Sequence, residues 1–177
     1  MKTNLMTSAL FILLSVYPAW ATIHDGETPM DSNELRIAAA TVADSISEIE
    51  LLMETAAVES MGGNYAVPYR LKGQHGVFQI TKVTATDTLK WLNCVKPANF
   101  EFIMSFYDNQ MSLEENLERN VEFSAALCLA IYKRMAPRAD ITNRTNRAKL
   151  WKRVYNTALG SGTVEAYLSR CEKVLED

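Results

Sequence analysis

The chain contains few cysteines, histidines, glycines and prolines, and each shortage excludes a class of protein. Only three of its 177 residues are cysteine and two are histidine, which argues against a disulfide scaffold and a histidine-based metal centre. Seven glycines and five prolines exclude collagen-like and low-complexity chains. A net charge of −3 gives no electrostatic case for nucleic-acid binding. We therefore predict an ordinary globular protein with no metal, no cofactor and no nucleic-acid partner.

The first 21 residues are organised as a secretory signal peptide. Lys2 supplies a short positive region, an apolar run extends from Leu5 to Val16, and Ala19-Trp20-Ala21 matches a small-x-small cleavage site. A transmembrane helix is the weaker interpretation, because the run is short for a bilayer and no stop-transfer charges follow it. A signal-anchor that is later released also fits. We predict cleavage after Ala21, a periplasmic or secreted location, and no stable membrane insertion after processing.

The remaining chain is predicted to be mainly helical. Residues 22–32 have the composition of a linker, and residues 33–177 are expected to form one domain. Asp31 or Ser32 can cap a first helix. Apolar residues recur at alternating steps of four and three from residue 35 to residue 56, which predicts one helix, or two if Ser45 and its polar neighbours recap the chain.

Later segments give further helices around a buried one. Residues 64–75 predict a small hairpin or an irregular loop, and Thr84 or Thr86 is expected to cap the next helix. The run from Leu113 to Met135 is apolar on nearly every side after residue 121, which is typical of a central helix. Asn143 or Thr145 is expected to open another helix, and residues 164–175 form the last apolar stripe. The fold class is therefore mainly α, with at most a small β-hairpin.

The three cysteines predict no disulfide framework. Cys128 lies in an apolar run and Cys171 on an apolar stripe, so both are expected to be buried. The partner of Cys94, if it has one, cannot be read from the sequence. Neither His24 nor His75 has a cysteine at zinc-ligand spacing.

One carboxylate stands out at the end of the first apolar stripe. On a helical wheel centred on Ala56, Glu59 lies about 60° from the centre of the stripe and Glu54 about 160° away. Glu59 should border the packed face, where burial raises a carboxyl pKa and favours a general acid. Glu54 should face solvent. A surface glutamate that merely ends a helix is the alternative for Glu59.

Two motifs give this glutamate a context. Ala56-Ala57-Val58-Glu59-Ser60 is followed by Gly76-Val77-Phe78-Gln79-Ile80, and Tyr155-Asn156 comes later within a predicted helix. In order and spacing these segments resemble the lysozyme-like lytic transglycosylases, in particular phage-type cell-wall enzymes. The resemblance covers roughly residues 47–172. It implies a lysozyme-like α+β domain that cleaves peptidoglycan glycan strands.

The resemblance also implies roles for particular residues. Glu59 would be the catalytic acid and base, Gln79 would line the sugar groove, and Tyr155 would orient Glu59 with Asn156 beside it. Gly76 would let the backbone approach the ligand. Ser60 would belong to the substrate-binding set as a helix-end residue, because no His–Asp pair accompanies it as it would a nucleophile.

The chain departs from the family pattern at two places. Thr81-Lys82-Val83 stands where several relatives have a proline, and Ala158 stands where they have a glycine. These changes put the shape of the groove in question but leave the acid untouched.

The sequence offers no clear second carboxylate, and Asp87 and Glu101 are the remaining candidates. Hydrolytic glycosidases need a second carboxylate as base or nucleophile, whereas one glutamate suffices if the muramic 6-hydroxyl closes a 1,6-anhydro ring. We therefore favour a monomeric lytic transglycosylase over a hydrolytic muramidase.

Two other classes of function stay open. A catalytically silent glycan-binding part of a phage particle or secretion machine would keep the same groove without turnover. A membrane-associated helical protein would use a cluster of basic residues, although such clusters are more often solvated helix faces. The cluster consists of Arg138, Arg144, Arg147, Lys149, Lys152 and Arg153.

Overall fold

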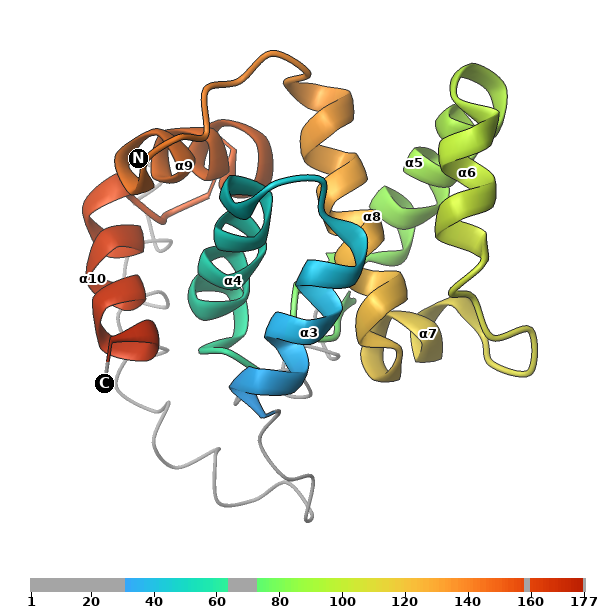
Figure 1. Ribbon diagram of the computed structural model, residues 1–177, viewed down its shortest axis with the longest axis horizontal. Coiled ribbons are helices and arrows are strands. Elements are labelled where there is room, and N and C mark those ends of the chain that lie inside the picture. The colour runs from blue at the N-terminus through green and yellow to red at the C-terminus, as the bar shows by residue number, and fades with distance from the viewer. Residues whose placement is uncertain (1–30, 64–72, 158–159, 177) are drawn as a thin grey trace, which may run out of the picture.

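The chain folds into helices with one short hairpin between them, as the computed structural model in Figure 1 shows. The structure describes residues 31–63, 73–157 and 160–176. The predicted signal peptide and most of the predicted linker lie outside the described residues, as do residues 64–72 of the predicted loop. The elements are α3 (Ser32–Val42), α4 (Ile46–Ser60), β1 (Gln74–His75), β2 (Ile80–Thr81), α5 (Lys82–Val95), α6 (Pro97–Met104), α7 (Leu113–Arg119), α8 (Val121–Met135), α9 (Arg144–Trp151), the π-helix η2 (Lys152–Asn156) and α10 (Val164–Leu175).

Side-chain caps set most of the helix starts. Asp31 caps α3 by accepting from Asn33 N at 2.9 Å, and Ser45 caps α4 by accepting from Glu48 N at 3.3 Å. The first stripe therefore forms two helices, which confirms the second alternative. Asn143 caps α9 as expected. The predicted cap of α5 was wrong, because Thr81 rather than Thr84 or Thr86 holds this position.

The long apolar run is also two helices. A single helix was expected from Leu113 to Met135, but the chain breaks at Asn120 between α7 and α8. Asn120 accepts from Phe123 N at 3.0 Å and donates to the carbonyl of Phe106 at 2.5 Å. The break thus depends on a contact with the segment after α6, a helix that periodicity did not predict.

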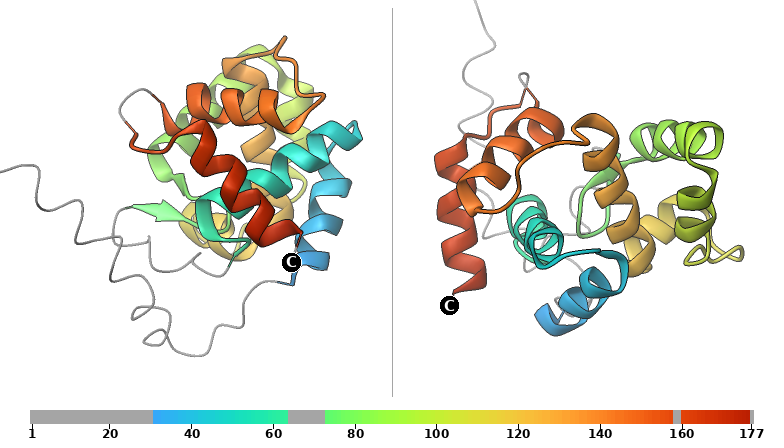
Figure 2. Two further views of the ribbon diagram at one scale, coloured as in Figure 1. Left: turned by 90° about the vertical axis from the view of Figure 1, so that its left-hand side faces the viewer. Right: turned by 45° about the horizontal axis from the view of Figure 1, so that its top comes forward.

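Helix α8 lies at the centre of the domain. It packs against α3, α4, α5, α6, α7 and η2, and its residues from Phe123 to Tyr132 are all buried. In Figure 1 and in the right-hand view of Figure 2, α9 and α10 lie beyond α4 on one side of α8, and α5 to α7 lie on the other. The predicted arrangement, helices around a central buried helix, is confirmed.

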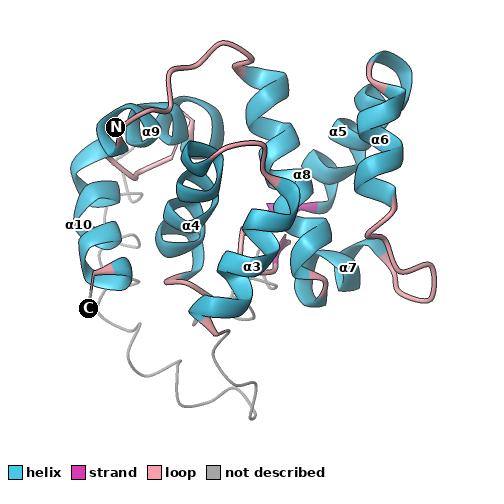
Figure 3. Cartoon of the chain, in the orientation of Figure 1, coloured by secondary structure: helices cyan, strands magenta, loops and turns pink. Residues whose placement is uncertain are grey.

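The two strands form a small antiparallel hairpin beside α7, as Figure 3 shows. Gln74 pairs with Thr81, and His75 pairs with Ile80. The turn between the strands is made of residues 76–79, so the second predicted motif becomes the tip of the hairpin. None of the helices in the described ranges is long and apolar enough to cross a membrane.

A second, smaller core lies between α4, α9 and α10. It contains Val58, Ala148, Trp151, Tyr167 and Cys171. Helix α4 therefore packs on α3 and α8 on one side and on α9 and α10 on the other. Cys128 and Cys171 are buried free thiols, as predicted, and Cys94 is exposed and free.

Candidate active site

Glu59 lies in the last turn of α4, where the backbone leaves the helix sharply. Met61 adopts a left-handed conformation with φ of 55°, and Gly62 and Gly63 continue with positive φ. The hydroxyl of Ser60 donates to the carbonyl of Ala56 at 3.1 Å and accepts from Gly63 N at 2.9 Å. Ser60 is buried and closes the helix end. The expectation of a helix-end residue is therefore confirmed, and its place among the substrate-binding residues stays a prediction.

Glu59 stands between two adjoining cavities of about 270 and 350 Å³. Both cavities are lined by Glu59 and by the amide side chains of Gln74, Gln79 and Asn156. Val58, Trp151 and Arg170 line the first cavity only, whereas Ile80, Val154 and Tyr155 line the second only. We call the two cavities together the groove. The carboxyl group of Glu59 thus lies between two cavities that are lined by side-chain amides. Such amides can donate hydrogen bonds to sugar hydroxyls and accept hydrogen bonds from them.

The carboxyl group of Glu59 is held by an indole. Nε1 of Trp151 donates to Oε1 of Glu59 at 2.7 Å. Burial raises the pKa of Glu59 to about 7, against the opposing effects of the Trp151 hydrogen bond and the positive charge of Arg170. The raised pKa expected from the helical wheel is therefore found. Near neutral pH the group is populated in both states, as a residue that acts as acid and then as base requires.

Gln79 lies at the tip of the hairpin with its side chain folded back onto the turn. Its backbone has φ of 52°, and Nε2 donates to the carbonyl of Gly76 at 2.6 Å. The side chain is almost fully buried and lines both cavities. The structure thus places Gln79 in the groove, as predicted.

Gly76 makes a close backbone contact that the sequence did not predict. A Cβ at this position would lie 1.8 Å from the carbonyl oxygen of Leu117, and φ is 67°. The backbone of Gly76 therefore approaches α7 closely. Gly76 is absent from the described lining of the groove. Its requirement for glycine comes from docking the hairpin against α7.

Tyr155 lines the groove, but its hydroxyl does not orient Glu59. The hydroxyl donates to the carbonyl of Phe78 at 2.8 Å, so its one hydrogen is already engaged. The ring stacks on Tyr132 with centroids 5.4 Å apart. The predicted hydrogen bond to Glu59 was therefore wrong, and Trp151 makes it instead. Tyr155 fixes the hairpin tip that carries Gln79.

Asn156 lies beside Tyr155 at the end of the π-helix η2. Its Oδ1 accepts from Nζ of Lys152 at 2.7 Å, and the same amine donates to the carbonyls of Thr157 and Gly160. A Cβ at Gly160 would lie 2.2 Å from the carbonyl oxygen of Asn156. Gly160 therefore allows close packing here. The wider turn of η2 is of a kind that occurs frequently at functional sites.

Glu54 is not exposed, which corrects the helical-wheel expectation. Its side chain is 2% exposed. Arg147 donates to both of its oxygens at 2.8 Å, and Arg144 and Tyr167 each donate at 2.9 Å. Burial alone would raise the pKa of Glu54, but the hydrogen bonds and charges of the two arginines hold it below its usual value. The wheel assumed one packed face, whereas α9 and α10 cover the other.

Three residues of the groove were missed at the level of sequence. A buried indole N–H usually needs an acceptor, and this signal could have paired Trp151 with a carboxylate. Arg170 donates to the carbonyl of Val58 at 2.6 Å beside Glu59, and no local pattern predicts this. Gln74 lines the groove from strand β1, where it pairs with Thr81 of β2, and the sequence did not predict this pairing.

No second carboxylate lines the groove among the residues that the structure describes. Asp87 forms an exposed ion pair with Arg134, and Glu101 lies on the exposed side of α6. Over the same residues, no cluster of three or more histidine, cysteine or acidic side chains could hold a metal ion. Glu59 is thus the carboxyl group in the lining of the described groove, and with a pKa of about 7 it can donate or accept a proton there.

Comparison of the chain with models of protein families, with curated proteins and with solved structures finds no match.

Proposed function

We propose that the protein is a lytic transglycosylase that cleaves the β-1,4 bond between N-acetylmuramic acid and N-acetylglucosamine in peptidoglycan. The observation that carries the proposal is Glu59, a carboxyl group with a pKa of about 7 between two amide-lined cavities. The order of the Glu59-Ser60 and Gly76-x-x-Gln79 motifs, in a mainly helical domain with one small hairpin, supports it.

The proposed reaction uses Glu59 twice. Its protonated form donates to the glycosidic oxygen while the bond from that oxygen to the muramic anomeric carbon breaks. The muramic 6-hydroxyl then attacks the same carbon, and the Glu59 carboxylate takes the hydroxyl proton. The products are a free 4-hydroxyl and a 1,6-anhydro ring, so no water is consumed and Glu59 ends protonated. A hydrolytic route would need a second carboxylate, which the described groove lacks.

Mass spectrometry of purified peptidoglycan incubated with the protein tests the reaction. The wild type should leave anhydro ends, which are lighter than reducing ends by one water. Glu59→Gln should keep the fold and lower cleavage by a factor on the order of 10² or more, since it removes the transferable proton. Glu101→Gln, an exposed change far from the groove, is the matched control.

Two other outcomes would replace the proposal. Reducing muramic ends would make the protein a hydrolytic muramidase that uses the same acid. Glycan binding without cleavage would make it a silent binding component of a phage particle or secretion machine.

The proposal includes export, since the substrate lies outside the cytoplasm. The intact mass of protein recovered from the periplasm or medium should correspond to a chain that begins at Thr22. A membrane-bound chain that retains residues 1–21 would contradict this.

A further inference from the structure

The basic cluster near the C-terminal end of the chain separates into two groups in the structure. Arg144 and Arg147 are neutralised by Glu54 in the second core. Lys152 is occupied by the loop that follows it. These three cations are committed to holding the fold and are not available to a partner.

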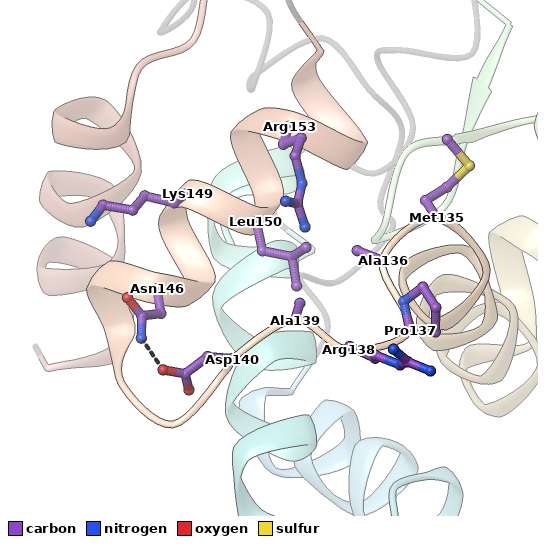
Figure 4. Close-up of a pocket in the computed structure, with 10 residues that line it drawn as sticks. All are labelled: Met135, Ala136, Pro137, Arg138, Ala139, Asp140, Asn146, Lys149, Leu150 and Arg153. Carbon is purple, nitrogen blue, oxygen red and sulfur yellow. Dashed lines mark hydrogen bonds between the residues drawn. The ribbon is translucent and has the colours of Figure 1, made fainter.

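The other three cations line a cavity formed by the described residues. Arg138, Lys149 and Arg153 are exposed, and none of them takes part in an ion pair of the described chain. They line a cavity of about 1030 Å³ between the end of α8, the following loop and α9. Figure 4 shows Arg153 pointing into this cavity, with Lys149 and Arg138 extending at opposite sides.

The cavity has one acidic side chain and an apolar floor. Both carboxylate oxygens of Asp140 are engaged, one by Thr142 and one by Asn146. The lining therefore carries three positive charges and one negative charge, and the negative charge is already engaged. Between them lie Ala136, Pro137, Ala139 and Leu150. Such a lining suits a ligand that carries carboxylates and small apolar groups together.

Two elements, α8 and η2, contribute residues both to the cavity and to the groove. Met135, at its edge, lies one helical turn beyond Ile131 on α8, and Arg153 directly precedes Val154 on η2. Ile131 and Val154 line the groove beside Glu59. A substituent that leaves a ligand in the groove along these two elements would run toward Arg153 and the cavity.

We propose that this cavity binds the acidic stem peptide of the glycan strand whose sugars lie in the groove, an inference that rests on the proposed function. Stem peptides branch from the muramic residues and carry free carboxylates between alanine side chains. An arginine guanidinium can hold a carboxylate by two parallel hydrogen bonds, and the alanine methyl groups match the apolar floor. A peptide of four residues is of a size that a cavity of this volume accommodates.

Binding of the isolated stem tetrapeptide, without sugar, tests the inference directly. Titration followed by calorimetry or NMR should show binding to the wild type, and binding should weaken with salt. Three glutamines in place of the cavity cations should weaken it about tenfold or more, since each ionic contact contributes a fraction of the affinity. The cavity variant carries Arg138→Gln, Lys149→Gln and Arg153→Gln. The control variant loses the same charge from exposed positions outside the cavity, by Arg36→Gln, Lys90→Gln and Lys173→Gln.

Several results would overturn the inference. One is that the wild type binds no peptide, and another is that the cavity variant binds the peptide as tightly as the wild type does. A third contrary result is a peptide with amidated carboxylates that binds the wild type as tightly as the unmodified peptide. Weaker binding of the cavity variant to anionic phosphatidylglycerol vesicles with unchanged peptide binding would assign the cations to a membrane surface instead.

Cleavage of stem-free glycan strands separates this inference from the proposed function. The cavity variant should cleave these strands as the wild type does, and should show a higher KM only on strands that carry stems. If the wild type binds the peptide but cleaves no strand, the proposed function fails and the peptide site stands. If the cavity variant has the KM of the wild type on stem-bearing strands, the peptide site fails and the function stands.

Discussion

Trp151 donates its indole N–H to Oε1 of Glu59 at 2.7 Å, and an indole nitrogen can donate but not accept. Oε1 therefore remains an acceptor whether Glu59 is charged or neutral. In the neutral carboxyl group the carbonyl oxygen is the better acceptor, so the hydrogen bond from Trp151 favours the transferable proton on Oε2.

Trp151→Phe should change the pH profile of cleavage. In the wild type the hydrogen bond from Trp151 favours the charged form of Glu59. Without it the pKa of Glu59 should rise above about 7, and the basic limb of the pH–rate profile should move to higher pH. Turnover should fall roughly three- to tenfold because the carboxyl group loses its orientation. Trp91→Phe, which contacts Arg134 and not Glu59, should leave both unchanged. An unaltered profile for Trp151→Phe would remove Trp151 from the site.

Stability should fall as the pH rises through the titration of Glu59. Its pKa is about 7 in the folded protein and 4.5 in the reference state, so between these values the folded state binds more protons than the unfolded state. A shift of this size corresponds to about 3 kcal/mol, lost from pH 4.5 to pH 8. Glu59→Gln should lack this loss and be more stable than the wild type at pH 8. Urea unfolding at pH 5 and pH 8 measures the difference, and parallel pH dependences would contradict it.

Glu54→Gln should destabilise the fold strongly. Arg147 is 4% exposed, and removing the charge of its partner leaves a buried cation, which costs about 3–5 kcal/mol. Glu50 is the control because it also pairs with Arg147, at 2.8 Å, but is 46% exposed. Glu50→Gln should cost less than about 1 kcal/mol. Denaturant unfolding measures the free energy of unfolding of both variants. Equal losses would contradict the prediction that the buried Glu54–Arg147 pair matters more for stability than the exposed Glu50–Arg147 pair.

Two glycines with the same backbone conformation should respond differently to alanine. Gly76 and Gly73 have φ of 67° and 69°, but a Cβ at Gly76 meets the carbonyl of Leu117, whereas one at Gly73 meets nothing within 4 Å. Gly73→Ala should cost only the conformational penalty, about 1–2 kcal/mol. Gly76→Ala must also displace the hairpin from α7, so it should cost more and weaken cleavage by moving Gln79. Thermal unfolding and peptidoglycan digestion test both effects.

The sequence predicted those parts of the fold that depend on neighbouring residues. Asp31, Ser45 and Asn143 cap helices because a short polar side chain can reach the next free backbone N–H, a local property. The burial of α8 follows from a run that is apolar on all sides. Glu59 could be found because a helix end, a border position and a glycine turn are all visible in the chain.

The remaining features depend on contacts between distant segments. Nothing near Glu54 indicates that Arg147, 93 positions later, neutralises it. The break at Asn120 depends on a carbonyl 14 positions earlier. The hydroxyl of Tyr155 finds a carbonyl 77 positions away, so its predicted partner was wrong although its place in the groove was right.

Helix α4 carries two glutamates whose charges behave differently. The arginines hold Glu54 ionised, whereas Glu59 titrates near neutrality. Acidification from pH 8 to pH 6 therefore adds close to one proton to the groove and almost none to the second core. The charge around Glu54 stays constant while the groove becomes less negative. A modest change in the pH of the surroundings would therefore alter which ligands the groove attracts without loosening the helices that shape it.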